Sequence, residues 1–151
     1  MKFGIKTPMQ HCSWQQMLNI WQASDELEIF DACWNFDHFY PLQGDPKGPC
    51  MEAWVTLTAL EAHTKRIRIG CMVNATPYRH PALTANMAAS LDIVSGGRLN
   101  LGLGAGWHEE ECAAYGIDLM PMKQRMNRFE ENVQVVKSLL SQETTDFTEN
   151  K

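Results

Sequence analysis

The sequence lacks long apolar stretches, paired-cysteine motifs and clusters of basic residues. No run approaches the roughly 18 apolar residues of a membrane-spanning helix, and the first segment has no apolar run of signal-peptide length. We therefore expect a cytoplasmic protein that has no membrane partner. The net charge of -5 supplies no basic surface for a phosphate backbone, which argues against nucleic acid as a partner.

The cysteines and histidines give no sign of a cross-linked or metal-binding protein. The five cysteines are odd in number and have no CxxC spacing, so they predict neither a disulfide framework nor a zinc site. The histidines share no ligand spacing either. We predict no metal, and reduced packing roles for most of the cysteines: Cys12, Cys33, Cys50, Cys71 and Cys112.

What the sequence does contain is a regular alternation of two kinds of segment. With 151 residues, 44% of them hydrophobic and 21% charged, it predicts a single globular domain over residues 1–151. Short β-branched or aromatic runs alternate with longer amphipathic runs, which predicts a parallel sheet with crossover helices. Four strand–helix units fit either a doubly wound sheet or half of an eight-fold barrel. The expected strands are 3–7, 29–36, 67–73 and 99–105, and the expected helices are 13–27, 52–63, 81–94 and 123–140.

The apolar spacing of the helices predicts which side chains face the core. Ser13 and Gln16 have the spacing of a capping box, and Pro81 suits a first helical turn. The polar segment 141–151 is expected to be disordered if nothing follows it, with 145–147 beginning a fifth strand. The predicted core faces are Trp14, Met17, Leu18, Trp21 and Leu27 in the first helix, Trp54, Leu57 and Leu60 in the second, Leu83, Met87, Leu91 and Val94 in the third, and Met126, Phe129, Val133, Val136 and Leu140 in the last.

Asp37 and His38 stand where the second apolar run meets an irregular segment. An imidazole titrates near neutral pH, so with a neighbouring carboxylate it can move a proton at a reacting centre. The alternative is that Asp37 caps a turn and His38 is a satisfied core residue. The pair alone does not decide between these readings.

Glycines are concentrated in the segment 102–106, GLGAG, which follows the fourth apolar run. Glycine lets a backbone approach a pyrophosphate, but a tryptophan and three glutamates follow here, and carboxylates repel a phosphate. Two readings remain: small residues at a crowded strand end, or close approach of the backbone to a flat ring.

Three segments together are more specific than any single motif: FDHFYPLQGDPKGPCMEAW, RIRIGCMVNATPYRHPALTANMAASLDIVSGGRLNLGLGAGWHEEE, and AYGI followed by RMNRFEE. In combination they resemble the bacterial luciferase-like family of flavin- and deazaflavin-dependent oxidoreductases, over residues 3–147. The resemblance implies an α/β fold that is the N-terminal half of a TIM-type (β/α)8 barrel. It also implies that the chain stops near the start of the fifth strand.

The resemblance further implies a cofactor cleft. Asp37 and His38 correspond to an aspartate and a histidine at the cofactor ring, the histidine handling a proton. Met72-Val73 corresponds to a non-proline cis peptide that backs the ring. Some relatives place a catalytic glutamate where this sequence has Trp107, which argues against a sugar-phosphate dehydrogenase. The implied cofactor-binding residues are Asp37, Met72, Val73, Asn74, Ala75, Gly106 and Trp107.

The leading functional hypothesis is an oxidoreductase fragment that uses the deazaflavin coenzyme F420 for hydride transfer to or from a small organic substrate. One alternative is an FMN-dependent monooxygenase of the same family. Another is a non-catalytic half-barrel, present as a subunit or as a gene remnant. Cutting a barrel leaves unpaired strand edges, so the expected partner is a second copy of the chain or a missing C-terminal half.

Overall fold

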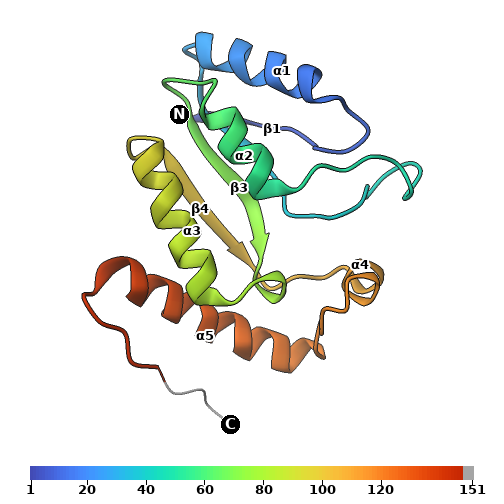
Figure 1. Ribbon diagram of the computed structural model, residues 1–151, viewed down its shortest axis with the longest axis vertical. Helices are drawn as coiled ribbons and strands as arrows, with labels where there is room; N and C mark the ends of the chain where they lie inside the picture. The colour runs from blue at the N-terminus through green and yellow to red at the C-terminus, as the bar shows by residue number, and fades with distance from the viewer. Residues whose placement is uncertain (148–151) are drawn as a thin grey trace. The chain divides into compact units, whose positions relative to one another are not determined.

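The computed structural model describes residues 1–147, and residues 148–151 lie outside the description. Strands alternate with helices along the chain, and the strands form one sheet in sequence order, with β1/β2 and β2/β3 parallel (Figure 1). The strands are β1 (Phe3–Lys6), β2 (Phe30–Asn35), β3 (Arg68–Ala75) and β4 (Leu99–Gly104). The helices are α1 (Trp14–Glu26), α2 (Ala53–Glu61), η1 (Thr76–Tyr78), α3 (Pro81–Val94), α4 (Glu109–Ala114) and α5 (Met122–Ser141). The predicted α/β order of four strand–helix units is confirmed.

The helix starts follow local rules that the sequence already contains. Ser13 caps α1, accepting a hydrogen bond from the Gln16 backbone N–H at 3.2 Å, while its own N–H donates to the Gln16 side chain at 2.8 Å. Glu52 caps α2 through a 2.7 Å bond from the Val55 N–H. Pro81 is the first residue of α3, as predicted.

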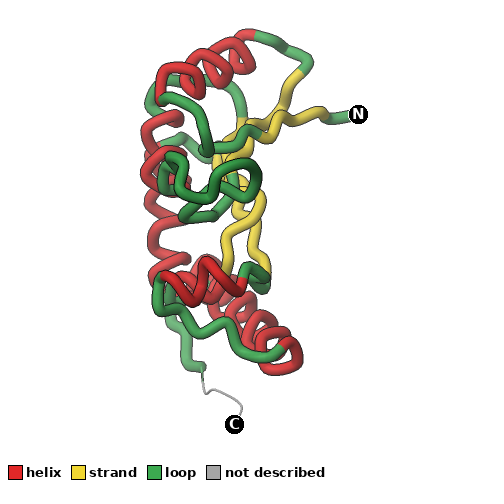
Figure 2. Tube along the Cα trace, turned by 90° about the vertical axis from the view of Figure 1, so that its right-hand side faces the viewer, coloured by secondary structure: helices red, strands yellow, loops and turns green. Residues whose placement is uncertain are grey.

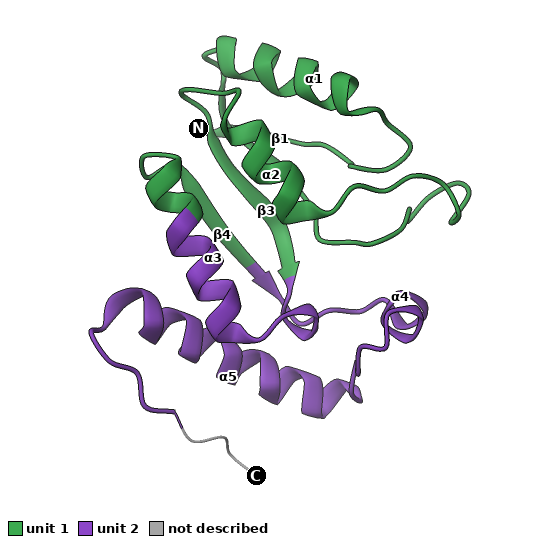
Figure 3. Cartoon of the chain, in the orientation of Figure 1, with its two compact units in different colours: residues 1–74, 91–102 green, residues 75–90, 103–151 purple. Residues whose placement is uncertain are grey.

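The chain divides into two compact units (Figure 3). The first comprises residues 1–74 and 91–102, and the second comprises residues 75–90 and 103–151. The boundary crosses β3, β4 and α3, so both units contain the ends of shared elements. The first unit contains most of the sheet together with α1 and α2.

In the first unit, helices lie on one side of the strands (Figure 2). The strand residues Cys33, Ile69 and Cys71 are at most 1% exposed. Trp34 points to the face opposite these residues: a Cβ on Gly4 would lie 3.1 Å from its Nε1, and a Cβ on Gly70 would lie 2.6 Å from its Cζ3. The indole therefore lies across both neighbouring strands, and glycine at these positions makes room for it.

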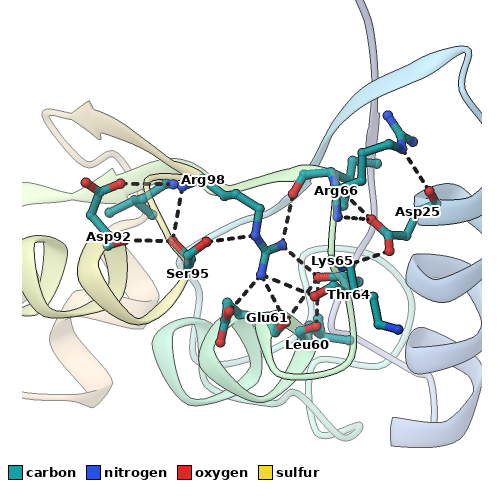
Figure 4. Close-up of polar contacts among 11 residues, drawn as sticks. Asp25, Leu60, Glu61, Thr64, Lys65, Arg66, Asp92, Ser95 and Arg98 are labelled. Carbon is teal, nitrogen blue, oxygen red and sulfur yellow. Dashed lines mark hydrogen bonds and ion pairs between the residues drawn. The ribbon is translucent and has the colours of Figure 1, made fainter.

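At the end of the sheet where β3 and β4 begin, Arg98 and Asp25 connect neighbouring segments through several hydrogen bonds (Figure 4). Arg98 forms a 2.7 Å ion pair with Glu61 and donates to the carbonyls of Ile67 and Ser95 at 3.1 and 2.9 Å. The Asp25 carboxylate accepts the backbone N–H groups of residues 65, 66 and 67 at 2.7 to 2.8 Å. This end of a parallel barrel serves stability, whereas ligands bind at the opposite end.

The predicted core faces are right for α2 and partly wrong elsewhere. Met17, Leu18 and Trp21 of α1 are buried, but Leu27 is 52% exposed because α1 ends at Glu26. On α3 the buried side chains include Ala85, Ala88 and Leu91, whereas the larger Leu83 and Val94 are exposed. On α5, Met126 and Leu140 are exposed, and the buried residues are Arg125, Asn132 and Val136. Large apolar residues were favoured in the prediction, whereas small or polar ones occupy these contact faces.

Two connections also differ from the sequence prediction. The segment 107–121, predicted to be a long connection, contains the short helix α4. Residues 145–147 are not in a strand, and the Thr145 hydroxyl lies 2.9 Å from that of Ser138 near the end of α5. The remainder of the segment expected to be disordered, 148–151, lies outside the described residues. Within residues 1–147 no helix is long and apolar enough to cross a membrane.

Candidate functional site

Asp37 and His38 follow directly from the C-terminal end of β2. Asp37 is 1% exposed, and His38 is half-buried with its ring edge-on to Phe36 at a centroid distance of 5.6 Å. The Cys50 thiol donates to the His38 carbonyl at 3.5 Å. The structure thus places a partly accessible imidazole next to a buried carboxylate in the chain, an arrangement able to hold and move a proton.

The end of β3 lies beside this segment. Asn35, the last residue of β2, pairs with Cys71 of β3, so the segment after β2 begins beside the last part of β3, which continues to Ala75. The Met72-Val73 peptide is cis, as the resemblance predicted. The side chains of Met72 and Val73 are 43% and 42% exposed, unlike the preceding buried residues of β3. They present an apolar surface at the strand end.

Asn74 has an unsatisfied acceptor. Its side-chain amide donates to the Gly102 carbonyl at 2.8 Å, while its Oδ1 is buried and has no hydrogen-bond partner within the described chain. Asn35 shows the same pattern, donating to the Ala53 carbonyl at 2.8 Å and leaving Oδ1 unpaired. Buried polar atoms normally have hydrogen-bond partners, so a donor is expected for each of these two oxygens.

The second unit contains the remaining predicted residues. Ala75 ends β3, and Gly106 follows β4 with a φ of +78°, a conformation that favours glycine. A Cβ on Gly106 would lie 3.0 Å from the Pro77 ring. Trp107 is 60% exposed, and its ring lies 4.6 Å from that of His108. Trp107 therefore offers a large, accessible aromatic surface beside Gly106, which has no side chain.

The predicted residues fall into two local groups, one in each unit. Asp37, His38 and Met72–Asn74 belong to the first unit, and Ala75, Gly106 and Trp107 belong to the second. Sequence reasoning missed the hydrogen-bonded pair of half-buried Tyr78 and fully buried Glu111 near the second group. Glu111 is the last of three consecutive glutamates. Only a predicted helix start at Glu109 would have shown that Glu111 is the one that faces inward.

The cysteines are not suited to nucleophilic chemistry. Burial raises the pKa of the Cys12, Cys33 and Cys112 thiols, which keeps them protonated near neutral pH. All five cysteines are free. In residues 1–147, no three His, Cys, Asp or Glu side chains are grouped so that they could hold a metal ion.

Comparison with known proteins identifies the family. The model of the luciferase-like monooxygenase family matches residues 1–149. The chain belongs to this family, and its sheet with covering helices is the N-terminal half of a TIM-type barrel. Members of the family are F420- or FMN-dependent oxidoreductases and monooxygenases.

Individual relatives differ in activity. The F420-dependent hydroxymycolic acid dehydrogenase of Mycobacterium tuberculosis is 37% identical over 84% of this chain and 35% of its own length. The 4-hydroxyprotoasukamycin monooxygenase of Streptomyces nodosus subsp. asukaensis is 39% identical over 82% of this chain and 33% of its own length. The oxygenating constituent of 3,6-diketocamphane monooxygenase from Pseudomonas putida, solved with FMN, superposes with a TM-score of 0.80 at 23% identity, over 100% of this chain and 42% of its own.

The chain spans less than half the length of these proteins. Coverage of the curated relatives is between 33% and 44% of their length. The matched part contains the first four strand–helix units of a fold that has eight.

Proposed function

We propose that this chain forms one wall of the cofactor site of an F420-dependent oxidoreductase that acts on a small organic substrate. F420, when bound, supplies hydride transfer, because its deazaflavin ring accepts or donates two electrons with a proton. The chain would bind and orient that ring and manage the substrate proton. The observation that carries the proposal is the cluster of His38, Met72, Val73 and Asn74 at the ends of β2 and β3.

The residues at this cluster fit a flat heteroaromatic ring. Exposed Met72 and Val73 offer an apolar face for the ring plane, and the unpaired Asn74 Oδ1 is an acceptor for a ring N–H. Binding such a donor would require the side chain to become accessible. Taken by itself, the second unit presents its own apolar surface at Gly106 and the exposed Trp107 indole.

The proposed proton-handling group is His38. Its half-buried ring is accessible to a ligand yet restrained by Phe36. Asp37 would orient the His38 imidazole or contact the cofactor ring directly.

Cofactor titration tests the proposal. The purified chain is mixed with F420 or FMN, whose absorption bands differ, and binding is followed by ligand fluorescence. We expect F420 to bind more tightly than FMN. Tighter binding of FMN would support the monooxygenase alternative, and no binding of either cofactor, even with a complementary half present, would support the non-catalytic half-barrel.

We also propose that the face of the sheet occupied by Trp34 is covered by a complementary C-terminal half. Strand alternation places Lys6 and Arg68 on this face. Lys6 lies over the Phe36 ring at 4.7 Å, and Arg68 donates to Asn100 Oδ1 at 2.7 Å. Neither has a carboxylate partner among the described residues. A second copy would bring cations against cations, whereas a half that carries carboxylates would neutralise them.

A further inference from the structure

Tyr78 and Glu111 connect the segments that follow β3 and β4. Tyr78 ends the short helix η1, and Glu111 lies in the first turn of α4. The Tyr78 hydroxyl donates a hydrogen bond to Glu111 Oε2, and Glu111 is completely buried. Both residues belong to the second unit (Figure 3). A side-chain bond thus joins two segments that are 33 residues apart in the sequence.

Two further contacts join the same segments. The Thr76 hydroxyl donates to the Gly104 carbonyl at 3.1 Å. Gly106 approaches the Pro77 ring so closely that a Cβ would lie 3.0 Å from it. Three consecutive residues, 76 to 78, therefore each contact the 104–111 segment, so the two segments are fixed along their length.

From Glu111 the contacts continue to Trp107. The Glu111 backbone N–H donates to His108 Nδ1 at 3.4 Å, and the His108 ring lies against the Trp107 ring. Trp107 itself is mostly exposed, so burial in a core does not hold its indole. The Trp107 ring therefore contacts His108, and His108 in turn accepts the Glu111 backbone N–H.

The Glu111 carboxylate is costly to bury. Removing a carboxylate from water is unfavourable unless hydrogen bonds or an opposite charge compensate for the lost hydration. Tyr78 supplies a hydrogen bond to this buried carboxylate. Burial raises the pKa of the adjacent Cys112 thiol, the Glu111 charge raises it further, and Tyr78 and the Arg125 charge lower it. Such a group supplies directional contacts that an apolar cluster would not.

We propose that Tyr78 and Glu111 are positioning residues that hold Gly106 and Trp107 where a bound cofactor ring contacts them. This inference rests on the proposed function. Loss of the Tyr78 hydroxyl would release the 104–108 segment while leaving the sheet of the first unit intact. The pair acts through Trp107 and Gly106, not by touching the reacting atoms.

The test compares Tyr78→Phe, Glu111→Gln and Glu61→Gln in the full chain. Backbone hydrogen exchange is measured for residues 103–108 and for β2 and β3, and F420 and FMN affinities are measured by ligand fluorescence. We expect Tyr78→Phe to speed exchange at 103–108 about tenfold and to weaken binding about tenfold, as for one lost bond to a charged group. Glu111→Gln, which still accepts the Tyr78 hydroxyl, should stay within threefold of the wild type in both measurements.

Glu61→Gln is the matched control, because it also replaces a buried glutamate but breaks the Arg98 pair in the first unit. It should lower the unfolding midpoint and leave cofactor affinity within twofold. Unchanged exchange at 103–108 in Tyr78→Phe, or equal loss of affinity in Tyr78→Phe and Glu61→Gln, would overturn the inference. If the wild type binds neither cofactor, the proposed function fails, and the exchange result alone then decides whether the pair holds the segment.

Discussion

Asn74 donates its side-chain amide to the Gly102 carbonyl at 2.8 Å, and this bond leaves its buried Oδ1 without a partner in the described chain. The bond joins β3 to β4 immediately after the cis peptide. Asn35, one strand away, forms a similar bond to Ala53, the first residue of α2, on the helix side of the sheet. The two asparagines therefore form a natural pair for comparison.

Replacing Asn74 with alanine should weaken F420 binding roughly fivefold, because one neutral hydrogen bond contributes about 1 kcal/mol. Fluorescence titration measures this change. Asn35→Ala is the control: it should lower the free energy of unfolding by a similar amount and leave affinity unchanged. Equal affinities for Asn74→Ala and the wild type would remove Asn74 from the proposed cofactor site.

His38→Ala should lower turnover at least ~100-fold once the chain is joined to a compatible C-terminal half, as expected for a positioned acid or base. Cofactor affinity should fall less than turnover. Steady-state kinetics with reduced or oxidised F420 provides the measurement. His63→Ala, at an exposed position outside the cluster, should remain near the wild-type rate. Near-normal turnover of His38→Ala would exclude the proton-transfer role.

Arg98→Lys should lower the free energy of unfolding by about 3 kcal/mol, because lysine cannot replace the several bonds of a guanidinium whose ion pair with Glu61 is nearly buried. Urea unfolding followed by circular dichroism measures the loss. Arg128→Lys, at an exposed site on α5, should change the free energy of unfolding by less than about 0.5 kcal/mol. Similar effects of the two substitutions would show that the hydrogen bonds and ion pair of Arg98 contribute little to the free energy of unfolding.

Asp25 should make stability depend on pH. Burial alone would raise its pKa, but backbone N–H donors from Ile67, Lys65 and Arg66 and the Arg66 charge together lower it. A lowered folded-state pKa contributes stability that is complete above the ordinary aspartate pKa and is lost as pH falls through the folded value. Asp25→Asn should cost about 2 kcal/mol at pH 7. In urea titrations this difference should shrink below the ordinary pKa, and a constant difference down to pH 2 would refute the assignment.

The isolated chain should associate without fixed stoichiometry, because β1 and β4 are the outer strands of the sheet and keep unpaired edges. Mixing with a C-terminal half of a related barrel should convert these species into a one-to-one complex. Sedimentation velocity distinguishes the two states. A stable symmetric dimer of the chain alone would contradict the argument from Lys6 and Arg68.

Local sequence rules were sufficient for the order of the elements. The Ser13 capping box and the Pro81 helix start depend on neighbours within a few residues, and the structure agrees with both. The family resemblance added the barrel and the cis peptide, which periodicity could not provide. Helix-face predictions from apolar spacing failed at Leu83 and Met126, which are exposed.

By itself, the sequence determined the four strands, the four long helices and which residues follow each strand, because caps, prolines and apolar periods act over short distances. Only the tertiary structure decided that Tyr78 meets Glu111, that Asn74 keeps an unpaired oxygen, and that Trp34 lies across Gly4 and Gly70. Each of these relationships joins residues at least 28 apart in the sequence, and it depends on strand register and on where each connection turns. Those properties are set by the packing of the whole sheet and its helices, not by local propensity.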